Sequence, residues 1–394
     1  MPGSLVLDVL LVLLLIGGFV YGIRRGLLHS VAAVAGLVAG GIGAFFAVPL
    51  VTGWVGSPAW RGPAVLAVVL LLVVGGYGVG ATIGGALSRG VGRRGPLRVL
   101  DRLLGGVANL AVSAAVLSMV AFSVVALGVP ILSPGIASST VVRSIDSVTP
   151  DPVRAFLAQL RAAVVDEGLP RITEALTGAP PEIPDLDTAS PALREAALSV
   201  ARITGNAFAC GQGQSGSGAV IAEDRVITNA HVVAGVEEPF VELPGRGAVP
   251  GRVVYFDPSD DLAVIHAPGL DGTPLPTGAA LATGDAAVVD GYPFGGPFRS
   301  GPAEVMARGP IIAGDVYGTG SAPRDVYTLA ADIEQGNSGG PLLDTAGALV
   351  GIVFAKSAEV EDVGYALTLD EVGPVIDRSA SLEQSVDSGA CVHG

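Results

Sequence analysis

Three separated segments in the second half of the chain carry the side-chain types that nucleophilic catalysis needs. In chain order they contribute His231 in Thr-Asn-Ala-His, Asp261 in Ser-Asp-Asp-Leu-Ala-Val, and Ser338 in Gly-Asn-Ser-Gly-Gly. A serine hydroxyl is a weak nucleophile at neutral pH and needs a positioned base, and an imidazole with its pKa of about 6.5 suits that role. A carboxylate on the other ring nitrogen then fixes the tautomer and stabilises the imidazolium. The three residues therefore predict a Ser-His-Asp triad.

The glycines around Ser338 predict an oxyanion hole. Gly336 permits a tight turn in which its own amide and that of Ser338 point together at a developing negative charge, and Asn337 lies between these two donors. A plain turn between strands is the alternative interpretation, because these residue types favour turns. The histidine segment upstream favours the catalytic one. We choose Asp261 over Asp260 as the acid because it directly precedes the apolar run that begins at Leu262.

Short β-rich runs separated by Gly, Pro and Asp make up the chain from Gly205 onward, which predicts an all-β domain of two small six-stranded barrels packed face to face. The predicted strands are Ala219–Ile221, Val226–Thr228, Val249–Phe256, Leu262–His266, Ala286–Tyr292, Glu304–Ile312, Val326–Leu329 and Ala348–Phe354.

The first third of the chain has a different character. The whole chain is 50% hydrophobic and only 15% charged, which is too apolar for an ordinary soluble enzyme. Each of four apolar stretches is about long enough to cross roughly 30 Å of hydrocarbon. Buried helices of a soluble domain are the alternative, but they would leave that domain almost no polar surface. The stretches are Leu5–Tyr21, Leu27–Leu50, Pro63–Leu87 and Leu103–Pro130.

The distribution of arginines predicts how these four helices are oriented. Residues 1–128 hold eight arginines and two acids, a charge of +6, so the total of −14 leaves −20 for the remainder. Arginines concentrate in the first and third loops, which are therefore expected to be cytoplasmic, with both termini and the acidic domain outside. Because the basic residues lie beside apolar stretches, we exclude nucleic acid as a partner and expect a lipid bilayer instead. The loop arginines are Arg24, Arg25, Arg89, Arg93, Arg94, Arg98 and Arg102.

A connector joins the two parts. Apolar residues at helical spacing predict an amphipathic helix over Pro150–Thr177, and a polar run with several prolines after it indicates an extended spacer. The predicted organisation is a four-helix transmembrane bundle over residues 1–130, a connector over 131–200 and the all-β domain over 201–394.

The two cysteines, Cys210 and Cys391, bracket the predicted all-β domain. Two distant cysteines could be unrelated buried thiols, but a domain outside the cytoplasm favours a disulfide between them. Cysteine and histidine nowhere show the spacing of a zinc site, so we predict neither a metal nor a cofactor.

The motifs and their order resemble the trypsin-like peptidases of the chymotrypsin fold, since subtilisins and α/β-hydrolases order their triads differently. With the four helices and the cysteines, the chain is similar over nearly its whole length to the actinobacterial MarP family, the mycobacterial acid resistance periplasmic proteases. Its N-terminal part resembles the colicin V production family. HtrA-type proteases share the serine motif but append PDZ domains, for which too few residues follow Phe354.

The MarP resemblance implies a periplasmic serine endopeptidase that acts on cell-envelope proteins and supports resistance to acid and oxidative stress. It places the triad on His231, Asp261 and Ser338 and the disulfide on Cys210 and Cys391. A membrane transport or assembly scaffold with an accessory or inactive protease domain is the rival hypothesis. The oligomeric state stays open.

Substrate preference also stays open. Asp332 lies six residues before Ser338, where trypsin-like enzymes place the acid that selects Arg or Lys. We expect Ile352, Val353 and Phe354 to line one wall of the S1 pocket, which would suit an apolar P1 residue equally well.

Overall fold

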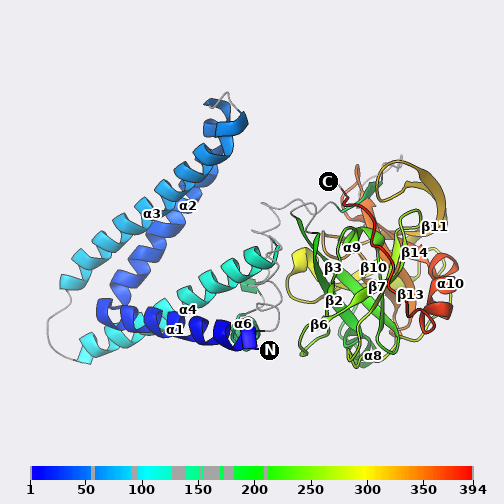
Figure 1. The fold of residues 1–394 in the computed structure, drawn as a ribbon, viewed down its shortest axis with the longest axis horizontal. Helices are drawn as coiled ribbons and strands as arrows, with labels where there is room; N and C mark the ends of the chain where they lie inside the picture. The colour runs from blue at the N-terminus through cyan, green and yellow to red at the C-terminus, as the bar shows by residue number, and fades with distance from the viewer. Residues whose placement is uncertain are drawn as a thin grey trace. The chain divides into compact units, whose positions relative to one another are not determined.

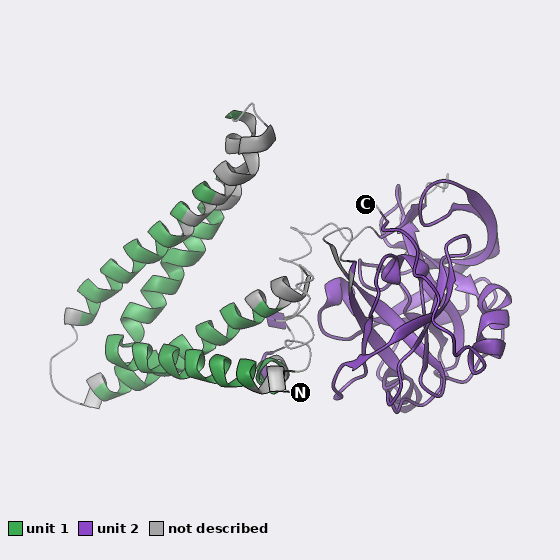
Figure 2. Cartoon of the chain, viewed as in Figure 1, with its two compact units in different colours: residues 1–121, 139–145 green, residues 122–138, 146–394 purple. Residues whose placement is uncertain are grey.

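The computed structural model describes residues 2–54, 58–90, 96–126, 139–150, 152–153, 169–172, 182–207 and 212–392. The chain divides into two compact units (Figure 2), here called the helical unit, residues 1–121 with 139–145, and the β unit, residues 122–138 with 146–394.

Four long helices dominate the helical unit: α1 (Pro2–Arg25), α2 (Leu27–Trp54), α3 (Pro58–Gly90) and α4 (Pro96–Ala126) (Figure 1). Each contains one of the predicted apolar stretches up to residue 126; residues 127–130 lie outside the described part. Within the described part of the chain, two segments are long and apolar enough to cross a membrane, Val6–Arg25 of α1 and Val99–Ser118 of α4, and α2 carries the shorter apolar segment Leu27–Gly43.

Glycines let α2 and α3 approach each other closely. A side chain at Gly36 would collide with the carbonyl oxygen of Gly76, and one at Gly76 would collide with that of Gly36. Gly80 meets the carbonyl of Ala32 in the same way. In a lipid environment the hydrophobic effect does not drive apolar helices together. Such helices usually associate through small residues that let their backbones pack closely.

The two acids of the helical unit both cap helices. Asp101 on α4 accepts hydrogen bonds from the amides of Leu27 (3.0 Å) and Leu28 (3.3 Å) at the start of α2. Asp8 on α1 accepts from the amides of Thr140 (3.2 Å) and Val141 (3.3 Å) at the start of α6 (Thr140–Val148). A carboxylate at a helix N-terminus satisfies amides that have no partner within the helix and complements the helix dipole.

The β unit contains two seven-stranded sheets. The first has the order β6 (Val249–Pro250), β5 (Phe240–Glu242), β2 (Val200–Ala207), β3 (Gln212–Ala222), β4 (Arg225–Thr228), β8 (Leu262–His266) and β7 (Arg252–Asp257). The second has the order β1 (Arg171–Ile172), β13 (Leu349–Ser357), β12 (Pro341–Asp344), β9 (Ala286–Gly291), β10 (Arg299–Gly314), β11 (Ser321–Ala330) and β14 (Val363–Thr368).

An additional antiparallel pairing between β13 and β14 closes the second sheet into a six-stranded ring, with β1 added in parallel to the outside of β13. The helices of this unit are short: α8 (Pro191–Ala197), α9 (Ala230–Val233), the single turn η2 (Pro293–Gly295) and α10 (Leu369–Ser379). One buried cluster lies within each sheet, and a third contains residues of both sheets together with α8 and α10.

All eight predicted strands fall in observed ones to within one residue, since only Tyr292 and Ala348 lie just outside β9 and β13, and Val249–Phe256 is divided at Gly251 into β6 and β7. The strands β2, β5, β12 and β14 were missed. The predicted helix over Pro150–Thr177 is wrong at Arg171–Ile172, which form β1, because Pro170 cannot continue a helix through its missing N–H. Most of its remaining residues lie outside the described part of the chain. Both β1 and α8 belong to the β unit, so this unit includes part of the predicted connector.

Asp290 is an unusual member of the core because its carboxyl group is fully buried on β9. Burial raises its pKa to about 6, and the nearby Ser300 hydroxyl offsets part of that rise. Neither carboxyl oxygen makes a hydrogen bond of good geometry with the described residues. A buried acid of this kind favours the neutral form, because desolvation penalises the charge.

We predict that Asp290→Asn stabilises the protein at high pH and not at low pH. An acid whose pKa is raised on folding contributes stability below its unfolded pKa of about 4, and that contribution is lost as the pH rises through about 6. A shift of about two units corresponds to about 3 kcal/mol, so the variant should gain about 2 to 3 kcal/mol at pH 8 and close to nothing at pH 4. Calorimetry of the detergent-solubilised chain at both pH values measures this.

The matched control is Asp271→Asn, because Asp271 is exposed and pairs with Arg246 on the surface. Its effect should stay within about 0.5 kcal/mol at either pH. An equal gain from Asp290→Asn at pH 4 and pH 8 would show that the carboxyl group is not buried as described.

Candidate active site

His231 lies on α9, a single helical turn that follows β4 directly. The side chains of Val232 and Val233 are buried in the core of the first sheet, which fixes the turn that carries His231. Thr228, the last residue of β4, donates its hydroxyl to the carbonyl of Ser217 on β3 at 2.7 Å. The histidine side chain is only 9% exposed.

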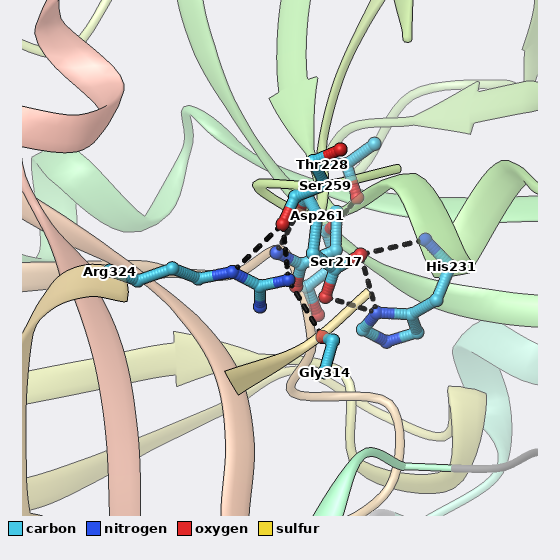
Figure 3. A network of polar contacts seen from close by, with 8 residues as sticks. Ser217, Thr228, His231, Ser259, Asp261, Gly314 and Arg324 are labelled. Carbon is cyan, nitrogen blue, oxygen red and sulfur yellow. Dashed lines mark hydrogen bonds and ion pairs between the residues drawn. The ribbon is translucent and has the colours of Figure 1, made fainter. Parts of the chain in front are cut away.

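Asp261 faces this imidazole from the start of β8. Its Oδ2 and Oδ1 lie 2.8 and 3.0 Å from His231 Nδ1, and Oδ1 also accepts the backbone amide of His231 at 2.9 Å (Figure 3). Because the carboxylate only accepts, Nδ1 must carry the proton, which leaves Nε2 with a free lone pair. The arrangement thus prepares His231 Nε2 to act as a base.

The backbone at Asp261 adopts a left-handed conformation, with φ of 55°. Such a φ costs energy for a residue other than glycine and persists only where neighbours hold it. Asn229 does so by donating its side-chain amide to the carbonyl of Asp261 at 2.9 Å. Asp260, the alternative acid, uses its amide for a bond to Asp257 Oδ1 (3.2 Å), and burial raises the pKa of its carboxyl group.

Ser338 lies in a turn between β11 and β12 that is attached to both sheets. Its carbonyl accepts the amide of Ser217 in the first sheet at 2.8 Å, and the amide of Gly339 donates to Val353 in the second at 2.8 Å. Gly336 and Gly339 have φ of 94° and 81°, and a side chain at Gly339 would collide with Ser217 and Thr228. The glycines are therefore required both for the turn and for its close packing.

Two backbone amides in this turn have no described hydrogen-bond acceptor. The amide of Asn337 donates to Glu334 at 3.0 Å, and its side-chain oxygen accepts the amide of Glu334 at 3.0 Å, so Asn337 holds the turn closed. Among the described residues, no acceptor is found for the amides of Gly336 or Ser338. These two amides are the expected oxyanion donors, while Asn337 has a structural role.

Ser338 itself is 3% exposed, and its Oγ makes no hydrogen bond with a described residue. The structure thus forms the His231–Asp261 pair but not a bond from Ser338 to His231. Catalytic hydrogen bonds are often long or misaligned without substrate and tighten in the Michaelis complex.

The residues expected to line S1 do not share one surface. Asp332 is exposed, and its carboxylate pairs with Arg299 at 3.1 Å. Ile352 and Phe354 belong to the core cluster that joins the sheets, whereas Val353, between them, packs in the ring of the second sheet with Ile333. Alternation along β13 accounts for this division, because successive side chains of a strand point to opposite faces. The three predicted wall residues are therefore divided between two clusters, Ile352 and Phe354 in one and Val353 in the other.

Sequence reasoning missed Ser217, which supports the nucleophile turn from β3. Its hydroxyl donates to the carbonyl of Gly336 at 2.7 Å and accepts the amide of Tyr292 at 2.9 Å. Its position directly before Gly218 in a β-rich run gave no signal of this, since the contact spans 119 residues. Asn229 was visible within the Thr-Asn-Ala-His segment, but its role was not inferred.

Cys391 is disulfide-bonded, while Cys210, its predicted partner, lies outside the described residues. The C-terminal tail that carries Cys391 is attached just after α9: the amide of Gly235 donates to Ser388 at 3.1 Å, and the Ser388 hydroxyl donates to Val236 at 2.8 Å. Within the described part of the chain, no group of three or more His, Cys, Asp or Glu could hold a metal ion.

Comparison with known proteins finds a matching family for each unit. Residues 216–352 match the trypsin-like peptidase domain, and residues 7–150 match the colicin V production protein family. The chain is 32% identical over 378 residues to the serine protease Rv3671c of Mycobacterium tuberculosis, covering 94% of each chain. The chloroplastic protease Do-like 1 of Arabidopsis thaliana is 35% identical over 174 residues, 42% of this chain and 39% of that one.

The crystal structure of the Rv3671c protease from M. tuberculosis in its active form covers 56% of this chain and all of that one, with 37% identity and a TM-score of 0.52. Similarity to Rv3671c thus extends over both the helical and the β unit. The chain belongs to the family of this mycobacterial serine protease, the MarP family.

Proposed function

We propose that the protein is a membrane-anchored endopeptidase that cleaves cell-envelope proteins through an acyl-enzyme. The observation that carries the proposal is the carboxylate of Asp261, which lies within hydrogen-bond distance of Nδ1 of His231 with both oxygens. Two similarities support it: the match to the trypsin-like peptidase domain, and the similarity to the serine protease Rv3671c over 94% of that protein's length.

In the proposed mechanism, His231 Nε2 accepts the proton of Ser338 Oγ as this oxygen attacks the scissile carbonyl carbon. The carbonyl oxygen becomes an oxyanion, which accepts hydrogen bonds from the amides of Gly336 and Ser338. Asp261 stabilises the imidazolium, which then gives its proton to the leaving amine. Water, activated by the same imidazole, hydrolyses the acyl-enzyme and regenerates Ser338.

The anchor consists of the helical unit. The segments Val6–Arg25 and Val99–Ser118 are each able to span a bilayer, and we propose that α2 and α3 span it as well, giving four crossings. The arginines of the first and third loops then lie in the cytoplasm and the β unit outside it. This location suits a role in resistance to acid and oxidative stress, with proteins of the cell envelope as substrates.

A second function, as a membrane transport or assembly scaffold, is favoured by one observation, the match of residues 7–150 to the colicin V production protein family. In that case the helical unit would act independently of Ser338. Cells that carry Ser338→Ala would then keep the function, whereas the proteolytic function would be lost.

We predict that Ser338→Ala abolishes peptide hydrolysis and labelling by a serine-directed phosphonate, because only the nucleophile is removed. The assay uses the detergent-solubilised chain with a casein-type substrate, and circular dichroism checks that the fold is unchanged. More than a few per cent of residual activity in a folded variant would contradict the assignment of Ser338.

A second prediction concerns the acid. Asp261→Asn should lower kcat by about 10⁴-fold, because an amide stabilises the wrong tautomer of His231. The matched control is Asp260→Asn, which changes the neighbouring carboxyl group and should keep kcat within about tenfold. The reverse order of effects would move the catalytic role to Asp260.

A third prediction tests the topology. A reporter that is active only outside the cytoplasm, fused after Gly394, should give a signal, while a reporter that is active only inside should not. A second fusion in the first loop, between Arg25 and Leu27, should give the opposite pattern. Signal from the cytoplasmic reporter at the C-terminus would overturn the proposed orientation.

A further inference from the structure

Arg324 on β11 is the largest of the fully buried side chains, with 2% of its surface exposed. Its Nη2 donates to the carbonyl of Ser259 at 2.7 Å and to that of Gly314 at 2.9 Å, and its Nε donates to Ser259 at 3.2 Å. Figure 3 shows the guanidinium directed at the segment that ends at Asp261. Neither Arg324 nor Gly314 took part in the sequence-based prediction of the site.

Ser259 belongs to the turn Asp257–Asp261, which joins β7 to β8. Inside the turn, Asp257 Oδ1 accepts the amides of Ser259 at 2.9 Å and Asp260 at 3.2 Å. From the first sheet, Asn229 holds the carbonyl of Asp261. Arg324 supplies the corresponding hold from the second sheet, across 65 residues of sequence. The turn with the strained Asp261 is therefore restrained from three directions.

The same guanidinium also contacts the strand that supports the nucleophile. Its central carbon lies 5.4 Å from the ring centroid of Phe354 on β13, within the range of a cation–π interaction. The preceding residue, Val353, accepts the amide of Gly339, next to Ser338. One side chain thus touches both the turn of the acid and the strand to which the serine turn is bonded.

Packing alone does not account for an arginine at this position. A buried guanidinium carries a large desolvation penalty, and an apolar residue of similar volume often stabilises a protein equally well or better. Among the described residues its hydrogen bonds go to backbone carbonyls and to no carboxylate. Burial and Asp257 raise the pKa of the Asp260 carboxyl group, and Arg324 opposes this through its charge. The hydrogen bonds of Arg324 to Ser259 therefore account for an arginine here better than packing does, because they hold the Asp257–Asp261 turn in place.

We propose that Arg324 is a positioning residue for catalysis, which aligns Asp261 with the Ser338 turn by joining the two sheets across the site. The proposal rests on the triad of the proposed function. Without the guanidinium, the carbonyl of Ser259 loses its partner, the turn relaxes, and the carboxylate of Asp261 no longer meets Nδ1 of His231 with both oxygens. Substrate binding does not use these contacts, so the loss should affect kcat rather than KM.

The test is Arg324→Met in the detergent-solubilised full chain, because methionine keeps part of the apolar stem against Phe354 and removes every donor. We expect kcat to fall about 100-fold with KM changed less than twofold, as a displacement of about 1 Å in a catalytic group can cost that much. In protein labelled with ¹⁵N-histidine, which contains four histidines, the hydrogen-bonded Nδ1 proton of His231 should shift or broaden. Arg324→Lys keeps a charged donor within reach of Ser259 and should restore part of kcat.

Arg308→Met is the matched control. Arg308 on the neighbouring β10 also stacks on an aromatic ring, 5.8 Å from the centroid of Tyr327, and pairs with Asp325 and Asp370, but it makes no described contact with the turn of Asp261. Its loss should leave kcat within about twofold of the parent.

An unchanged His231 resonance and an unchanged kcat in Arg324→Met would overturn the proposal, as would a loss of kcat that Arg308→Met reproduces. If the Met variant does not fold, Arg324→Lys decides by the same two measurements. A lowered kcat with an unchanged KM and a shifted His231 resonance supports the proposal, whereas a kcat and a resonance equal to those of the parent contradict it. Failure of the proposed function is distinguishable, because the parent would then hydrolyse no peptide, while the resonance would still report the alignment.

Discussion

The contact between the carboxylate of Asp261 and Nδ1 of His231 is the interaction on which the β unit depends for its chemistry. A carboxylate that is 2% exposed must have its charge compensated, and here an imidazole and a backbone amide of the same residue provide that compensation. This arrangement requires a strained φ at Asp261. The side chain of Asn229 and the hydrogen bonds inside the Asp257–Asp261 turn hold the backbone in that conformation. The short helix α9 and the start of β8 are thereby fixed to each other within the first sheet.

Ser338, the proposed nucleophile, lies in a turn that is hydrogen-bonded to both sheets. The amide of Ser217 in the first sheet donates to Ser338, and the amide of Gly339 donates to Val353 in the second. One core cluster likewise contains residues of both sheets. Relative movement of the sheets would therefore misalign the proposed triad even if each sheet kept its own fold. Contacts that cross between the sheets have a catalytic as well as a structural consequence.

The sequence predicted those parts of the molecule whose signals are local. The four helices follow from long apolar stretches, and the contact of His231 with Asp261 follows from short motifs with a chemical reason for each residue. The catalytic role of Ser338 stays a prediction. Strands such as β2 were missed because polar residues and a glycine interrupt their apolar pattern. The division of Ile352, Val353 and Phe354 between two clusters could not be predicted either, since a strand buried on both faces reads as continuous apolar sequence. Ser217 and Arg324 act over 119 and 65 residues, and no local pattern marks such contacts.

The two-residue strand β1 lies upstream of every other strand of the enzyme, yet it pairs in parallel with Lys356 and Ser357 of β13. Its hydrogen bonds run from the amide of Lys356 to Pro170 at 3.1 Å and from that of Ala358 to Ile172 at 3.0 Å. After a cut in the chain between Ile172 and Pro191, only these noncovalent contacts would hold β1 to β13, and its loss would leave this end of β13 unpaired. Because an unpaired strand edge is a template for pairing with another extended chain, the enzyme with β1 and the enzyme without it would present different surfaces to their surroundings.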